Sequence, residues 1–276
     1  VGLARGQQEL KEATDLNQTV LKLYQAGKYA NAIPLAQRAL DLREQTLGPT
    51  HPDVAQSLNN LAGLYYIQGR YAQAEPLYKR SLAIQEQALG PEHPNVAQSL
   101  NNLAELYRTQ GRYAQAEPLY ERSLAIRWKT LGPDHPDVAQ ALNNFAGLYF
   151  VQGRYAQAEP LYKRSLETRE QALGPNHPDV AQSLNNLAEV YRTLGQYEQA
   201  ESFFKRSLAI QERSLGPDHS EVAKTLNNFA ELYKAQNRYA QAEPFFKRSL
   251  AIREQTLGPD HPEVAQSLNN LAGLYH

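Results

Sequence analysis

The chain has 276 residues and a formal net charge of −1, with 28 basic and 29 acidic side chains. This balance provides no general attraction to nucleic acid or to anionic lipid, so we expect neither as a partner. Cysteine is absent, which excludes disulfides and thiolate metal sites and fits a cytoplasmic location. No apolar run approaches the ~20 residues of a membrane-spanning helix, and the N-terminal segment lacks the apolar stretch of a signal peptide.

The sequence repeats with a period of 42 residues, and the repeats begin at His51, His93, His135, His177, His219 and His261. A fixed period of this length is typical of solenoids, in which each repeat packs against its neighbours. We expect a tail at 1–8 and one solenoid over 9–276, with a diverged repeat at 9–50, full repeats at 51–92, 93–134, 135–176, 177–218 and 219–260, and a lone first helix at 261–276. Because methionine is absent and the chain stops inside a repeat, we interpret it as part of a longer protein.

The diverged repeat at 9–50 keeps several features of the later copies. Asn17 and Gln18 stand where the other repeats have two asparagines, and Gly27 and Tyr29 are in phase with their counterparts. We expect this repeat to act as an N-terminal cap.

The first helix of repeat 51–92 is predicted to run from Pro52 to about Gln68. Its apolar residues fall on one helical face, with the spacing i, i+4, i+7, i+8 and i+11: Val54, Leu58, Leu61, Ala62 and Tyr65. His51 precedes a proline, which favours the extended backbone that a helix N-cap requires. Gly69 supplies the left-handed stop.

A second helix is predicted from about Tyr71 to Leu89, where Gly90 and Pro91 end it. Its buried stripe consists of Tyr71, Ala74, Tyr78, Ser81 and Leu82. Two helices joined by such a short turn form a hairpin, and a hairpin cannot bury both faces alone, so the hairpins must stack. The fold class is therefore all-α.

Later repeats vary this pattern at single positions. Asn237 replaces the turn glycine, and asparagine is the next-best residue for a left-handed turn. Ser220 replaces the proline after the linker histidine, and we expect it to cap its helix. Trp128 stands where the other repeats have glutamate, which indicates an exposed position, either a contact point or a neutral surface change.

Leu58, Leu61, Ala62, Tyr65, Gly69, Tyr71, Ala74, Tyr78 and Ser81 match the signature positions of the tetratricopeptide repeat, which this chain resembles. The longer repeat, with LNNLA in the first helix and AEPLYKRSLAI in the second, resembles the cargo-binding repeats of kinesin light chain and of bacterial proteins with similar repeats. The resemblance implies a right-handed α-α superhelix, with first helices lining a concave groove. It also implies ligands with tryptophan- or tyrosine-acidic motifs.

The outer face of each first helix carries a pair of asparagines. These pairs stand at 59–60, 101–102, 143–144, 185–186, 227–228 and 269–270. Asparagine is a mediocre helix former, so its recurrence in mid-helix requires a reason. A row of amides, each with a donor and an acceptor, can hold the backbone of an extended peptide. The alternative is that one asparagine of each pair bonds to the neighbouring hairpin.

Positions beside the asparagines differ between repeats and suggest specificity. Glycine with aromatic or aliphatic neighbours alternates with Glu–Arg pairs, so apolar pockets alternate with charged positions; the alternative is that each Glu–Arg pair satisfies itself. The candidate peptide-binding residues are Asn59, Asn60, Tyr66, Asn101, Asn102, Glu105, Arg108, Asn143, Asn144, Phe150, Asn185, Asn186, Arg192, Lys224, Asn227, Asn228 and Lys234.

Signals for chemistry are missing from the sequence. There is no phosphate-binding, dinucleotide-binding, nucleophile-elbow or HExxH motif, so we expect neither an enzyme nor a cofactor. The repeat histidines lie one per linker, which favours helix capping over a metal site. We expect a protein interaction module that binds an extended peptide. The alternatives are a structural or self-associating spacer, and the sensor region of a larger signalling protein.

Overall fold

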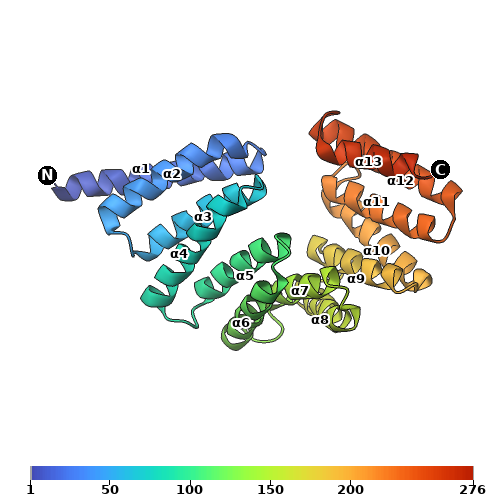
Figure 1. The fold of residues 1–276 in the computed structure, drawn as a ribbon, viewed down its shortest axis with the longest axis horizontal. Coiled ribbons are helices and arrows are strands. Elements are labelled where there is room, and N and C mark those ends of the chain that lie inside the picture. The colour runs from blue at the N-terminus through green and yellow to red at the C-terminus, as the bar shows by residue number, and fades with distance from the viewer. Residues whose placement is uncertain (1, 276) are drawn as a thin grey trace. The chain divides into compact units, whose positions relative to one another are not determined.

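The computed structural model describes residues 2–275, and every regular element within them is an α-helix. Consecutive helices run antiparallel and pack as hairpins, with helix A first and helix B second (Figure 1). The helices are α1 Gly2–Gln25, α2 Tyr29–Leu47, α3 Pro52–Ile67, α4 Tyr71–Leu89, α5 Pro94–Thr109, α6 Tyr113–Leu131, α7 Pro136–Val151, α8 Tyr155–Leu173, α9 Pro178–Thr193, α10 Tyr197–Leu215, α11 Ser220–Ala235, α12 Tyr239–Leu257 and α13 Pro262–Ala272.

The chain divides into two compact units at Gly132 and Pro133. Unit 1 contains the hairpins α1–α2, α3–α4 and α5–α6, and unit 2 contains α7 to α13. Among the described residues, no helix combines the length and apolar character that crossing a membrane would need.

Residues 2–8 were expected to form a tail, but they are helical and continue α1. The reason is packing against the end of α2. A Cβ placed on Gly6 would lie 3.3 Å from Thr46 Cγ2, and the Thr46 hydroxyl donates to Glu9 Oε2 at 3.2 Å. Arg5 and Glu9 form an ion pair one helical turn apart, at 2.9 Å, which adds a small helix-stabilising contribution.

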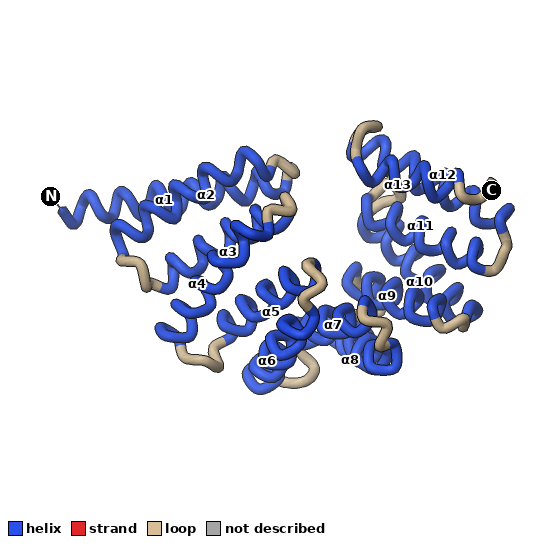
Figure 2. Tube along the Cα trace, in the orientation of Figure 1, coloured by secondary structure: helices blue, strands red, loops and turns tan. Residues whose placement is uncertain are grey.

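Short loops join the helices within each hairpin (Figure 2). The turn after α3 places Gly69 at φ 71°, a left-handed conformation that glycine adopts without steric cost. Asn237 takes the same place after α11 at φ 58°, as its sequence position predicts.

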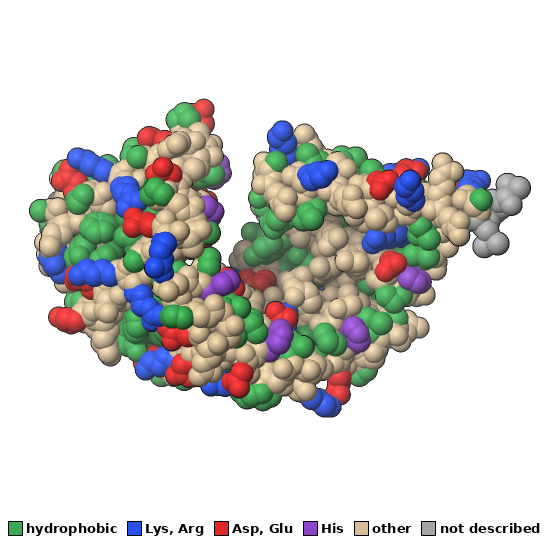
Figure 3. Space-filling model, turned by 180° about the vertical axis from the view of Figure 1, so that it is seen from behind, with side chains coloured by type: hydrophobic (Ala, Val, Ile, Leu, Met, Phe, Trp, Pro, Cys, Tyr) green, Lys and Arg blue, Asp and Glu red, His purple; other side chains and the backbone are tan. Residues whose placement is uncertain are grey.

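Histidine caps six of the A helices. In each case Nδ1 accepts the backbone N–H two residues later; at His93, for example, it accepts from Asn95 at 3.1 Å. At α11 the cap is His219 rather than the expected Ser220, because Ser220 already lies inside the helix and His219 Nδ1 accepts from Glu221 N at 3.2 Å. The histidines form separate surface patches among intermingled acidic and basic side chains (Figure 3).

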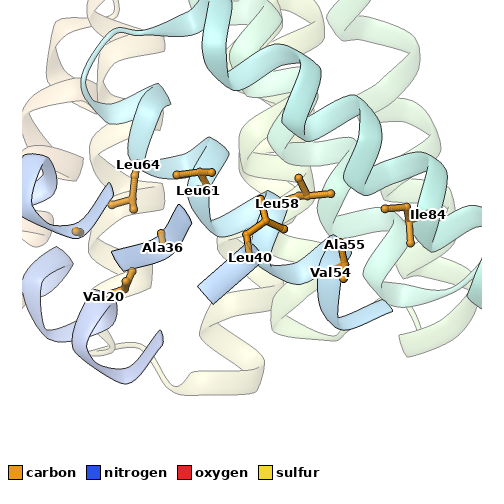
Figure 4. Close-up of a cluster of buried hydrophobic side chains, with 10 residues drawn as sticks. Val20, Ala36, Leu40, Val54, Ala55, Leu58, Leu61, Leu64 and Ile84 are labelled. Carbon is orange, nitrogen blue, oxygen red and sulfur yellow. The ribbon is translucent and has the colours of Figure 1, made fainter. Parts of the chain in front are cut away.

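The core lies between helices A and B. Val20, Leu40, Leu58 and Ile84 belong to one continuous apolar cluster that spans the first hairpins of unit 1 (Figure 4). Alanine lines the closest contacts: Ala62, Ala74 and Ala104 are fully buried. A buried serine on helix B then ties it to helix A, as in Ser81, whose hydroxyl donates to the Ala55 carbonyl at 2.7 Å.

Candidate functional site

A pocket of about 450 Å³ opens on the surface formed by the A helices of unit 1, which we call the helix-A face. Its walls come from three successive A helices and from one tyrosine of helix B: Val20, Leu21, Tyr24, Asn59, Asn60, Gly63, Leu64, Tyr66, Ile67, Tyr78, Asn102 and Glu105. The volume falls within the range of small-ligand sites, which are mostly apolar with a few polar groups. We refer to it as the unit 1 pocket.

Five of the residues proposed from the sequence meet in this pocket: Asn59, Asn60, Tyr66, Asn102 and Glu105. They come together because equivalent positions of neighbouring A helices stack across the repeats. The space lies beside Gly63, which has no side chain to fill it. The Tyr66 hydroxyl forms a hydrogen bond with Thr109 Oγ1 of α5 at 2.9 Å, which holds Tyr66 at the wall of the pocket.

Glu105 forms the polar end of the pocket. Its carboxylate accepts hydrogen bonds from Arg108, at 2.7 Å, and from the Tyr120 hydroxyl, at 2.5 Å. Burial, together with the adjacent Glu105 carboxylate, raises the pKa of Tyr120, so this hydroxyl stays protonated and donates. The carboxylate is therefore neutralised by its own repeat.

The asparagine pairs mostly bond to one another across repeats. The second asparagine of one repeat donates to the first asparagine of the preceding repeat. The observed pairs are Asn102 to Asn59 at 3.0 Å, Asn186 to Asn143 at 2.8 Å and Asn270 to Asn227 at 2.9 Å. The inter-hairpin alternative is thus the arrangement observed for these amides. They line the helix-A face but also hold neighbouring A helices together.

Other amides of the row differ in burial and in partners. Asn101, Asn143 and Asn185 are between 5% and 8% exposed, so these first asparagines lie mainly inside the stack. Asn144 accepts from Gln140 Nε2 at 2.8 Å. The Asn185 side-chain oxygen is buried without a hydrogen-bond partner among the described residues. Asn60 is exposed and Asn228 is half-buried, so these two leave amide surface accessible.

Most charged side chains on the helix-A face form ion pairs within their own helix. Arg108 binds Glu105 at 2.7 Å and Arg192 binds Glu189 at 3.0 Å, which is the alternative that the i, i+3 spacing left open. Lys224 is exposed and lies 4.0 Å from Glu221, while Lys234 is half-buried. In unit 2, Phe150 packs against the Tyr155 ring with centroids 5.5 Å apart.

The sequence analysis did not assign Val20, Leu21, Tyr24, Leu64 and Tyr78 to the site. Leu21 and Tyr24 could have been found, because they stand 42 residues before Gly63 and Tyr66. Tyr78 was correctly placed in the buried stripe of helix B, and its side chain is 4% exposed. No sequence signal showed that its hydroxyl reaches the helix-A face.

Two family models cover most of the chain. A model described as the nephrocystin-3 TPR domain matches residues 3–131. A second, described as tetratricopeptide repeat, matches residues 137–213, 179–255 and 221–276. Nephrocystin-3 from Xenopus laevis is 41% identical over 61 residues, which is 22% of this chain and 5% of that protein. The chain thus matches only a small part of the length of this relative.

Solved structures show the same fold. A Podosopora anserina putative kinesin light chain with nearly identical TPR-like repeats is 28% identical, with a TM-score of 0.63 over 75% of this chain and 97% of that chain. BtubC from P. vanneervenii is 25% identical, with a TM-score of 0.64 over 90% of this chain and 94% of that chain. Both align over almost their full lengths with helix hairpins of this protein.

Proposed function

The chain belongs to the tetratricopeptide repeat family, whose fold generally serves as a scaffold for protein interactions, and on that premise we propose that its helix-A face binds an extended peptide. The observation that supports this proposal is the unit 1 pocket, which lies across three A helices and leaves amide and aromatic groups accessible. A single pocket on a solenoid face suits one anchor side chain of a peptide that runs across the repeats.

In this proposal the anchor side chain enters beside Gly63, between Tyr24 and Tyr66. The exposed amide of Asn60 bonds to the peptide backbone next to it. Most other amides of the row contribute by holding the A helices in register, since their hydrogen bonds are already made between repeats. The chain acts as a non-enzymatic adaptor, in a cytoplasmic setting and without nucleic acid or membrane.

Unit 2 contributes a different chemistry to the same function. Lys224 and Lys234 lie on its A helix α11. Among the residues that the structure describes, no carboxylate lies closer to either lysine than the 4.0 Å that separates Lys224 from Glu221. They provide positive charge that attracts acidic residues of a ligand. Arg108 and Arg192 contribute less, because each is neutralised by its neighbouring glutamate.

A peptide array incubated with the whole chain tests the proposal. We expect a set of extended peptides that share an aromatic residue to bind, and substitution of that residue by alanine to abolish binding. The Asn60→Ala variant should bind these peptides more weakly while unfolding at the same temperature, because Asn60 is exposed and makes no hydrogen bond within the described structure. Capture of no peptide above scrambled controls would overturn the proposal.

A structural spacer is the second candidate, and the inter-repeat amide bonds favour it. Those bonds stabilise the stack whether or not the face is occupied. A spacer predicts that the array selects nothing. It also predicts that sedimentation at rising protein concentration either shows a monomer throughout or shows end-to-end self-association.

A further inference from the structure

The Tyr78 hydroxyl lies at the wall of the unit 1 pocket without a hydrogen-bond partner among the described residues. We propose that Tyr78 is the specificity-determining residue of this pocket, and that it selects an uncharged phenol side chain, a tyrosine of the partner, over apolar and acidic side chains. This inference deepens the proposed function and relies on the same pocket.

The neighbouring repeat shows why this hydroxyl is unpaired. In repeat 93–134 the equivalent Tyr120 hydroxyl donates to Glu105, which projects from the adjacent turn of helix A. Repeat 51–92 has Gly63 at the position of Glu105, and a Cβ placed there would lie 3.6 Å from Tyr78 Oη. The glycine removes the partner of the hydroxyl and opens the space in front of it by the same change.

The burial of Tyr78 makes the unpaired hydroxyl selective. The side chain is 4% exposed, and burial raises the pKa of its hydroxyl, so it remains a neutral donor and acceptor. Sites with buried polar groups discriminate strongly against ligands that lack the matching group, because the polar group then stays unpaired. An apolar anchor such as phenylalanine would leave the Tyr78 hydroxyl in that state.

The other residues that line the pocket determine which polar side chain of a ligand can bind next to the Tyr78 hydroxyl. Val20, Leu21 and Ile67 provide apolar contacts, and Tyr24 and Tyr66 provide aromatic surface. Glu105 carries the negative charge of the lining, and no lysine or arginine is among the described residues that line the pocket. A carboxylate would lose its hydration there without gaining a lysine or arginine partner from the lining. An ammonium would compete for a carboxylate that Arg108 and Tyr120 already satisfy. A phenol can both donate to and accept from the Tyr78 hydroxyl.

Small molecules that mimic single ligand side chains test the proposed role of Tyr78, with the whole chain as the binding protein. p-Cresol, toluene and p-toluate represent tyrosine, phenylalanine and an acidic aromatic group. Their binding is followed by NMR through the backbone amide of Gly63. We expect p-cresol to bind about three- to tenfold more tightly than toluene, the range that one additional net hydrogen bond supplies, and p-toluate to bind most weakly.

Three variants locate the source of the preference. Tyr78→Phe removes only the hydroxyl, so p-cresol and toluene should bind equally. Tyr120→Phe makes the same change one repeat further on, where the hydroxyl is already bound, and should keep the preference for p-cresol. Gly63→Gln places an amide that can accept from the Tyr78 hydroxyl in this space without adding a charge, since Tyr66 stands where an arginine would be needed; it should abolish probe binding while the protein unfolds at an unchanged or higher temperature.

Equal affinity for p-cresol and toluene in the parent protein would overturn the inference, as would a preference that persists in Tyr78→Phe or tighter binding of p-toluate. Failure of the proposed function looks different. In that case p-cresol still binds beside Gly63 with the Tyr78-dependent preference, but the peptide array selects nothing. If peptides bind and Tyr78→Phe does not change their tyrosine preference, the proposed function stands and the role of Tyr78 is rejected.

Discussion

Repeats 51–92 and 93–134 have equivalent helices, but their helix-A faces differ in whether the polar groups are bonded within the repeat. In repeat 93–134, Glu105 joins Arg108 and Tyr120, so the polar groups of its helix-A face are satisfied within the repeat. In repeat 51–92, Gly63 leaves Tyr78 unpaired and a pocket open. The comparison teaches that core and surface are encoded at separate positions: in these two repeats, the residue at position 63 or 105 of helix A decides whether the helix-B tyrosine hydroxyl is bound within its repeat or faces a pocket.

Glu105→Gly converts the second repeat into a copy of the first at this position, and we expect the largest effect from it. The change removes the carboxylate that Arg108 and the buried Tyr120 hydroxyl both bind, and it adds a glycine inside α5. Losing hydrogen bonds to a charged group costs about 1.5–3 kcal/mol, and a mid-helix glycine costs about 1 kcal/mol. Denaturant unfolding should therefore show a loss of about 2–4 kcal/mol.

Glu189→Gly is the matched control for this change. Glu189 also binds an arginine three residues later, but Phe204, which has no hydroxyl, stands at the position equivalent to Tyr120. The loss should be smaller, about 1–2 kcal/mol, since only the ion pair and helix propensity are affected. Equal losses for the two variants would show that the Tyr120 hydroxyl does not depend on Glu105.

Ala62→Leu and Ala104→Leu test the part that the two repeats share. Both alanines are fully buried at the contact between helices A and B. A leucine there would overpack the hairpin and cost about 1–3 kcal/mol. We expect similar losses in the two repeats, measured by thermal and denaturant unfolding. A variant that melts like the parent would mean that its alanine does not set the helix spacing.

The hairpins could be predicted closely because their signals are local. α3 runs from Pro52 to Ile67 and α4 from Tyr71 to Leu89, where the cap histidine, the turn glycine and the apolar spacing place them. Asn237 adopted the left-handed turn for the same reason. The helix at residues 2–8 was missed because its support comes from Thr46, a contact that no local pattern encodes.

The site could be predicted only in outline. Repeat phase placed Asn59, Asn60 and Tyr66 on one face, and the structure gathers them in one pocket. The partners of the amides were undecided, because Asn102 and Asn59 are 43 residues apart and their bond depends on how closely adjacent A helices stack. The orientation of the Tyr78 hydroxyl depends on the absence of a side chain at Gly63, which is a three-dimensional effect.

Asn102→Ala and Asn60→Ala separate the structural amides from the accessible ones. Asn102 donates to Asn59 at 3.0 Å and accepts from Gln98 at 2.9 Å, whereas Asn60 is exposed. We expect Asn102→Ala to lower the free energy of unfolding by about 0.5–1.5 kcal/mol and Asn60→Ala to change it by less than about 0.5 kcal/mol. If Asn60→Ala is the more destabilising variant, the amide row does not stabilise the stack as described.

The contact between repeats 51–92 and 93–134 should make the free energy of unfolding depend on pH, and we expect this to be the smallest effect of the series. Glu75 of α4 accepts from Arg112 at 2.6 Å and from Tyr107 at 3.1 Å, and it lies 2.7 Å from Lys79. These partners, Arg112 above all, lower the pKa of Glu75 from its ordinary value of 4.5 to about 2. Because the folded pKa is the lower one, Glu75 stabilises the fold above about pH 4.5, and this contribution is lost as the pH falls towards 2.

Glu75→Gln should therefore flatten the dependence of stability on pH between about 4.5 and 2, measured by denaturant unfolding at a series of pH values. Glu159→Gln is the comparison, because Glu159 binds Lys163 and Tyr191 but has Gln196 where Arg112 would stand. Glu159→Gln should change the pH dependence of the free energy of unfolding less, because the arginine that contributes most at Glu75 is missing there. Salt should shrink both effects, because these ion pairs lie near the surface. If the two variants have the same slope, Arg112 is not what couples repeat 93–134 to its neighbour.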